Sequence, residues 1–205
     1  FVQRAAAEAS ATSALVIGGD PDRAVGPFPD ACDLLASGLL ARYGLCEVLF
    51  AGYPEGHPRI SARVLEEALR AKLALACRQG LEASMVTQFG FEPAPLLRWI
   101  AALRAGDIVC PIRVGVAGPA SVATLAKFAV RCGVGASLRA LARGHTAFAR
   151  ILAEAGPDGL IAGLAAGEDP SRPIDGLHIF TFGGVRRTAE WISGYLRREP
   201  LSPHS

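Results

Sequence analysis

The sequence predicts an α/β protein built on a parallel sheet. Short apolar runs alternate with stretches of helical spacing, and each apolar run is nearly continuous, which is typical of parallel strands covered on both faces. With 205 residues and 51% hydrophobic content, the chain is long enough to bury one sizeable core. A net charge of +2 is far below the excess of positive charge that nucleic-acid-binding proteins usually carry, so we expect no nucleic-acid partner.

Five apolar runs predict strands, and the segments around them predict helices. The chain opens in an Ala-rich helical pattern, and the strands follow at 14–17, 48–53, 83–89, 111–116 and 176–182. Helical spacing occurs at 29–43, 61–78, 94–104, 121–131, 137–143, 146–155, 158–165 and 185–197. Ser61 is suited to cap the N-terminus of the helix 61–78. We expect one domain over residues 1–198, followed by a flexible tail at 199–205.

Polar residues favour a barrel over a doubly wound sheet. Asp20, Tyr53, Gln88 and Thr181 lie at or just past the carboxyl ends of four different strands. Side chains that converge from several strand ends are the arrangement of a (β/α)₈ TIM barrel. A doubly wound sheet would instead be expected to show one glycine fingerprint that opens a helix. We therefore predict a partial barrel of about five β/α units. Because five strands cannot close an eight-stranded barrel, we expect such a fragment to be unstable, to associate into a homo-oligomer through its open edges, or to require a missing N-terminal part.

The cysteines and the lengths of the apolar runs indicate in which compartment the protein resides. Five scattered cysteines without a CxxC pair predict reduced, mostly buried thiols in a cytoplasmic protein, and no metal site. No apolar run approaches the ~20 residues that a membrane span needs, and no signal peptide is evident, so we expect no membrane association. The chain begins at Phe1 rather than Met, which indicates either processing or numbering that starts within a longer protein.

Three residues near the first two strand ends have both a functional and a structural interpretation. Asp20 follows a strand in a tight turn and either accepts a hydrogen bond from a heterocycle or serves only the turn. Tyr53 either meets a ligand or packs beneath the barrel mouth. His57, held between Pro54 and Pro58, either contacts an anion, or caps a helix or belongs to a solvated loop.

Four residues further along the chain carry the same ambiguity. Lys72 lies on the following helix, where a lone lysine is more often part of a solvated face. Gln88 ends a strand with a group that both donates and accepts, which suits the edge of a pterin, flavin or nucleobase. Phe128 is either core or a stacking surface, and His178 is either a core histidine or a ligand contact.

With these residues in place, the chain resembles the methylenetetrahydrofolate reductase family. The most specific matching segments are Ala51-Gly52-Tyr53-Pro54-Glu55-Gly56-His57-Pro58 and Val86-Thr87-Gln88-Phe89-Gly90-Phe91-Glu92. Weaker ones are Ile17-Gly18-Gly19-Asp20-Pro21, Leu69-Arg70-Ala71-Lys72, Val114-Gly115-Val116 with Phe128, and His178-Ile179-Phe180-Thr181. They follow the family's order across nearly the whole chain.

The resemblance implies a (β/α)₈ barrel that binds FAD non-covalently. It implies an oxidoreductase in which NADH or NADPH reduces the flavin, which then reduces 5,10-methylenetetrahydrofolate to 5-methyltetrahydrofolate in methionine biosynthesis. Asp20 would lie near the flavin ring and the pterin, as the catalytic residue of this chain. Tyr53, His57 and Lys72 would contact the flavin's ribityl and phosphate groups. The folate would meet Gln88, Phe128 and Thr181.

The chain also departs from the family pattern. The family's general acid, a glutamate on the first barrel strand, has no counterpart, because the sequence begins in the helix before the family's fourth strand. Gly18 replaces an arginine, and Gly183-Gly184 replaces Asn-Arg after the last strand. Two alternatives therefore stay open. One is a non-catalytic partial barrel that binds folate or flavin or pairs with another subunit, and the other is a different folate-linked one-carbon enzyme, such as a methyltransferase.

Overall fold

The computed structural model describes residues 1–18, 25–134, 156–169 and 174–198. Within these ranges five strands form one sheet in the order β1-β2-β3-β4-β5, and every neighbouring pair is parallel. The strands are β1 (Ser13–Val16), β2 (Glu47–Gly52), β3 (Glu82–Thr87), β4 (Ile112–Ala117) and β5 (Gly176–Phe180). Strand order that follows chain order, with helices between, confirms the expected α/β class.

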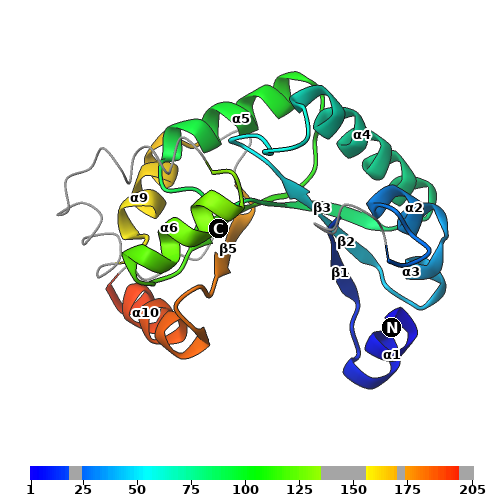
Figure 1. Ribbon diagram of the computed structural model, residues 1–205, viewed down its shortest axis with the longest axis horizontal. Coiled ribbons are helices and arrows are strands. Elements are labelled where there is room, and N and C mark those ends of the chain that lie inside the picture. Colours follow the sequence, from blue (N-terminus) through cyan, green and yellow to red (C-terminus); the bar gives the residue numbers. More distant parts are fainter. Residues whose placement is uncertain (19–24, 135–155, 170–173, 199–205) are drawn as a thin grey trace.

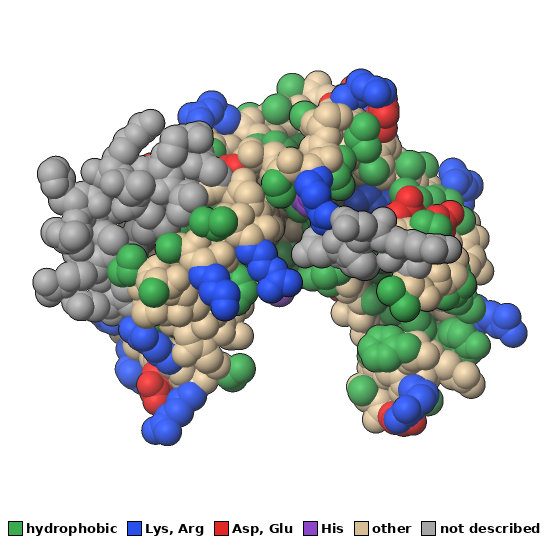
Figure 2. All heavy atoms as spheres, in the orientation of Figure 1, with side chains coloured by type: hydrophobic (Ala, Val, Ile, Leu, Met, Phe, Trp, Pro, Cys, Tyr) green, Lys and Arg blue, Asp and Glu red, His purple; other side chains and the backbone are tan. Residues whose placement is uncertain are grey.

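The sheet curls into an arch that has the shape of a half-barrel. Figure 1 shows α2, α4 and α5 along its convex side, with β1 and β5 at the two ends of the arch. The space-filling view in Figure 2 shows the hollow between the two limbs, with α1 at the end of one limb and α10 at the end of the other. The described residues therefore leave one edge of β1 and one edge of β5 without a neighbouring strand.

The helices agree with the predicted pattern, with one difference. They are α1 (Val2–Ala9), α2 (Ala31–Ala36), α3 (Leu39–Arg42), α4 (Ala62–Arg78), α5 (Pro93–Ala105), α6 (Val122–Arg131), α9 (Asp158–Gly167) and α10 (Val185–Arg198). The single helix expected over 29–43 is two short helices, because Gly38 adopts a left-handed conformation with φ 69° between them. Ser61 caps α4 as expected, since its side chain accepts a hydrogen bond from the Val64 N–H.

Several predictions fall outside the described residues. These are Asp20, the helices expected over 137–143 and 146–155, and the tail at 199–205. Among the described helices, none combines the length and the apolar character needed to cross a bilayer.

Strand alternation gives the sheet two different faces. On the convex face, Phe50 packs beneath Lys72 of α4, and Gly52 packs against Trp99 of α5. The concave face carries the alternate residues, and Glu47 there accepts hydrogen bonds from Ser84 Oγ at 2.9 Å and Arg113 Nη2 at 3.2 Å. The main apolar core therefore lies between the sheet and its helices. On the concave face, Glu47, Ser84 and Arg113 form a polar layer near the amino ends of the strands.

Candidate functional site

Three sequence-predicted site residues lie at one edge of the sheet. Tyr53 follows β2, Gln88 follows β3 and Thr181 follows β5, each as the first residue after its strand. Because all five strands are parallel, their carboxyl ends share an edge, and these three residues stand along it. Asp20, the fourth strand-end candidate, lies outside the described residues.

Backbone contacts hold Gln88 at this edge. Its N–H donates to the Gly52 carbonyl at 2.7 Å, which ties it to the end of β2. Its side-chain Oε1 accepts from the Phe89 N–H at 3.3 Å, and the side chain is half-buried. Since Oε1 accepts a backbone hydrogen bond, the Nε2 group is the part of the carboxamide that could donate to a ligand.

Next to Gln88, strand β4 approaches the end of strand β3 very closely. The Gly115 N–H donates to Thr87 Oγ1 at 2.8 Å, a buried bond that takes the place of a ladder bond between β3 and β4. A Cβ at Gly115 would lie 2.9 Å from Phe180 Cε2 and 3.0 Å from the Gln88 carbonyl carbon, and would overlap the Thr87 carbonyl oxygen. Only glycine allows this approach, so the position of Gln88 depends on residue 115.

Contacts within the loop after β2 set the orientation of the His57 ring. The Tyr53 and His57 rings meet edge to face, with centroids 5.3 Å apart and planes at 87°. The Arg59 N–H donates to His57 Nδ1 at 3.2 Å. In the neutral imidazole the proton therefore resides on Nε2, which makes that atom a hydrogen-bond donor of the kind that a phosphate accepts. Pro58 packs against Gly133, so the loop extends toward the end of α6.

Lys72 is not part of a solvated face, which corrects the simpler interpretation of the sequence. It is half-buried, and its Nζ lies 5.2 Å from the centroid of the Phe50 ring in a cation–π contact. Burial lowers the pKa of Lys72, and the nearby Cys32 thiol and Asp30 carboxyl partly oppose that shift. Among the described residues no hydrogen bond or ion pair joins Lys72 to an acidic partner.

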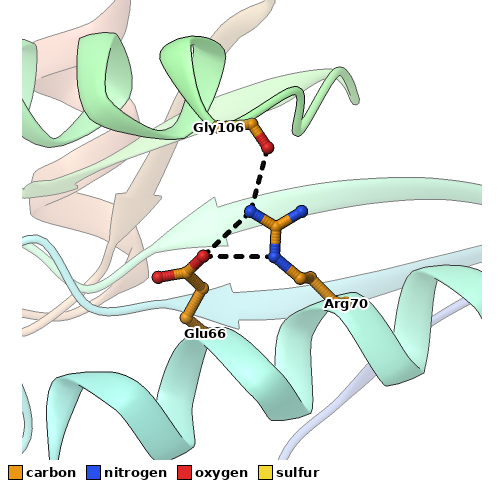
Figure 3. Close-up of polar contacts among 3 residues, drawn as sticks. All are labelled: Glu66, Arg70 and Gly106. Carbon is orange, nitrogen blue, oxygen red and sulfur yellow. Dashed lines mark hydrogen bonds and ion pairs between the residues drawn. The ribbon is translucent and has the colours of Figure 1, made fainter.

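Tyr53 and Lys72 line one cavity of about 300 Å³ between α4 and α5. Its walls are mostly apolar and include Trp99 of α5, a residue that sequence reasoning did not single out. Its charged residues, besides Lys72, are Glu66 and Arg70. Figure 3 shows that Glu66 and Arg70 both lie on α4 and that Arg70 reaches across to the end of α5. Arg70 Nη2 donates to Glu66 Oε1 at 2.8 Å and to the Gly106 carbonyl at 2.9 Å.

Phe128 belongs to an aromatic cluster at the carboxyl end of the sheet. Its ring stacks on Phe182 with centroids 4.3 Å apart, and Phe182 stacks on Phe180 at 5.5 Å. Phe89 contacts both Phe180 and Phe182 edge-on. One face of Phe128 is therefore covered within the chain. The sequence analysis did not single out Phe182 as a site residue. It follows His178 and Phe180 at every second position, which is the spacing of side chains on one face of a strand.

His178 lies on the concave face beside the polar layer. Its ring meets Phe180 edge-on at 4.7 Å, and it is half-buried. Burial, and secondarily the positive charge of Arg113, lower the pKa of His178 below its usual 6.5. His178 lies within β5 rather than at its end, paired in the sheet register with Gly115 of β4.

The described residues are chemically compatible with FAD but suggest no metal site. Tyr53 and Lys72 place an aromatic ring and a cation on an apolar cavity, and His57, which contacts Tyr53 outside the cavity lining, adds an N–H donor; this set suits a ring system that carries phosphate. Within the described ranges, no group of three or more His, Cys, Asp or Glu residues is placed to hold a metal ion. The five cysteines form no disulfide, and of these only Cys110 is buried while Cys46 and Cys77 are exposed, so the expectation of mostly buried thiols was wrong.

No protein-family model matches the chain.

Proposed function

We propose that this chain is the cofactor- and folate-binding part of a methylenetetrahydrofolate reductase-like oxidoreductase with a (β/α)₈ TIM-barrel architecture. The observation that carries the proposal is the row of Tyr53, Gln88 and Thr181 at the carboxyl ends of three parallel strands. Side chains from several strand ends at this face are how barrel enzymes hold substrate. Their identities also match the segments through which the sequence resembles that family.

The proposed cofactor is FAD, with NADH or NADPH as the co-substrate. FAD supplies hydride transfer between the nicotinamide and the folate. Lys72 provides a cation for a phosphate group, and the Nε2 donor of His57 provides a hydrogen bond to the same kind of group. Tyr53 contacts His57 and lines the cavity together with Lys72, and so stands next to both proposed phosphate donors.

The proposed substrate is 5,10-methylenetetrahydrofolate, which Gln88, Phe128 and Thr181 would bind. The Nε2 donors of Gln88 suit a pterin carbonyl or ring nitrogen, and Asp20 would approach the same ring and the flavin. Phe128, fixed from behind by Phe182, offers its other face to an aromatic ring. We assign the general-acid role to no residue of this chain.

The proposal is tested by measuring ligand affinities of Gln88→Ala. We expect weaker binding of 5-methyltetrahydrofolate, by roughly tenfold for the loss of one or two hydrogen bonds, with little change in FAD affinity. Gln3→Ala is the matched control, because Gln3 is an exposed glutamine of α1. Equal folate affinity in wild type and Gln88→Ala, with FAD affinity lost instead, would contradict the assignment.

The alternative function, a non-catalytic partial barrel that pairs with another subunit, is favoured by a different observation. β1 and β5 each have an edge without a partner strand among the described residues, and the Arg113 side chain on the concave face is 39% exposed. Because this chain carries no general acid for the folate step, the distinguishing measurement is reduction of the bound FAD by NADH, which needs no such acid. Binding of FAD and folate without reduction of the flavin by NADH would support the alternative.

A further inference from the structure

The two lysines of the chain lie in very different surroundings. Lys72 is half-buried and lines the apolar cavity between α4 and α5, with its Nζ 5.2 Å from the centroid of the Phe50 ring. Lys127, the only other lysine, is exposed on α6. A primary amine on the wall of an apolar cavity is a potential nucleophile, and its chemistry depends on what holds it as an ammonium ion.

The acidic residue of the cavity does not hold Lys72 as an ammonium ion. Glu66 is the one carboxylate among the described lining residues, and Arg70 Nη2 donates to its Oε1 at 2.8 Å. The negative charge of Glu66 is therefore compensated within α4. Within the described ranges no carboxylate forms an ion pair with Lys72.

The carboxylate on the neighbouring helix is also engaged. Asp30 caps α2, and its Oδ1 accepts backbone hydrogen bonds from the first turn of that helix at 2.7 and 3.0 Å. Burial lowers the pKa of Lys72, and the Cys32 thiol and the Asp30 carboxyl oppose that shift only in part. A desolvated lysine without a bound anion loses its proton more readily, which makes its nitrogen a better nucleophile.

The rest of the cavity suits a small aromatic molecule. Its volume of about 300 Å³ lies at the lower end of the ~300–1,000 Å³ found for ligand pockets, and its walls are mostly apolar. Trp99 supplies an aromatic wall, for which Gly52 leaves room, because a Cβ there would lie 2.5 Å from Trp99 Cη2. Two lining residues, Ala62 of α4 and Ala102 of α5, are exposed, so the cavity is reached from solvent between these helices.

We infer that Lys72 binds aromatic aldehydes covalently in this cavity, as an imine. The nitrogen attacks the carbonyl carbon, the new C–N bond forms, and the carbonyl oxygen leaves as water with two protons from the nitrogen. In sum, the lysine ammonium and the aldehyde give a protonated imine and water, so the step needs no oxidant or reductant. The positive charge stays on the nitrogen, which preserves its contact with the Phe50 ring.

The experiment is reductive trapping of the full chain with benzaldehyde and cyanoborohydride, which donates hydride to the imine carbon and leaves a benzylated lysine. Peptide mass spectrometry then gives the rates of benzylation of Lys72 and of Lys127, which is a control within the same molecule. Access to solvent alone would favour the exposed Lys127. We expect Lys72 to react faster by about tenfold, with a rate that saturates with benzaldehyde, because the cavity holds the carbonyl beside the amine. Equal rates, or faster reaction of Lys127, would overturn the inference.

Two further measurements test whether the aldehyde binds in the cavity. Ala102→Phe places a ring in its mouth and should lower the rate at Lys72 to that at Lys127, whereas Ala101→Phe, exposed but outside this cavity's lining, should not. Benzyl alcohol, which has the same ring but no carbonyl, needs no substitution: in the wild type it should slow the reaction of Lys72 and leave that of Lys127 unchanged. A rate at Lys72 that benzyl alcohol does not change would contradict binding in the cavity.

The inference needs neither FAD nor folate, so it does not rest on the proposed function. Selective benzylation of Lys72 in a chain that retains no FAD would support the inference and contradict the proposed oxidoreductase. A chain that retains FAD, but whose Lys72 reacts no faster than Lys127 when FAD is absent, would support the oxidoreductase and overturn the inference.

Discussion

Substitution of Gly115 by alanine tests whether the approach of β4 to β3 positions Gln88. The added methyl group would lie 2.9 Å from Phe180 Cε2 and 3.0 Å from the Gln88 carbonyl carbon, and closer still to the Thr87 carbonyl oxygen. No rotamer change relieves an overlap with backbone, so the two strands have to separate. Separation would also break the 2.8 Å bond from the Gly115 N–H to Thr87 Oγ1.

The expected cost follows from these two effects. Overpacking of a well-packed site costs about 1–3 kcal/mol, and a buried hydrogen bond contributes about 1 kcal/mol. We therefore expect Gly115→Ala to lower the free energy of unfolding by about 3 kcal/mol. The displacement of Gln88 should also weaken the binding of 5-methyltetrahydrofolate, measured without denaturant, where the variant is still folded.

Urea denaturation followed by circular dichroism measures the effect, and Gly159→Ala provides a matched control. A Cβ at Gly159, in α9, meets nothing within 4 Å, so alanine there should raise the free energy of unfolding by about 0.5–1 kcal/mol through its better helix propensity. A Gly115→Ala protein whose unfolding free energy lies within about 0.5 kcal/mol of the wild type would refute the reasoning.

Three further predictions concern single contacts and the edges of the sheet. Thr87→Val removes the buried acceptor of the Gly115 N–H and should lower the free energy of unfolding, measured by urea denaturation, by about 1–3 kcal/mol. An unchanged free energy of unfolding would show that the Gly115 N–H finds another acceptor. Because the pKa of His178 is lowered, the unfolded chain binds more protons than the folded one just below pH 6.5, so the stability contributed by the neutral imidazole is present above that pH and lost on acidification. His178→Gln should flatten the loss of stability measured from about pH 7 to about pH 5, and an unchanged slope would contradict this. Light scattering should detect association of copies through the open edges of β1 and β5, whereas a monomer at every concentration would speak against it.

The five strands were predictable from sequence, although β3 and β5 end at Thr87 and Phe180, two residues before the ends expected at 89 and 182. Each apolar run is bounded by turn residues and lies in a regular alternation with helices, so local signals suffice to place Tyr53, Gln88 and Thr181 at one edge. The break at Gly38 was missed because the helical spacing continues across it, while the left-handed conformation of that glycine interrupts the helix.

The cavity was not predictable, because it depends on packing between residues distant in the sequence. Trp99 meets Gly52 and Lys72 meets Phe50 only when α4 and α5 pack on the same strand. A lysine in a helix carries no local signal that its amine lies over an aromatic ring rather than in water. The exposure of Cys46 and Cys77 was equally unpredictable. It depends on where the loop before β2 and the outer side of α4 lie in the fold, and not on the apolar residues next to them in the sequence.

The most direct test of the proposed function is flavin retention by the full chain. The protein would be incubated with FAD, separated from free flavin by gel filtration, and examined by absorbance, with circular dichroism to confirm that it is folded. We predict retained flavin absorbance that falls when Lys72 is replaced by methionine and persists in Lys127→Met. A folded, colourless wild-type protein after the same treatment would contradict the assignment of a flavin site to this half-barrel.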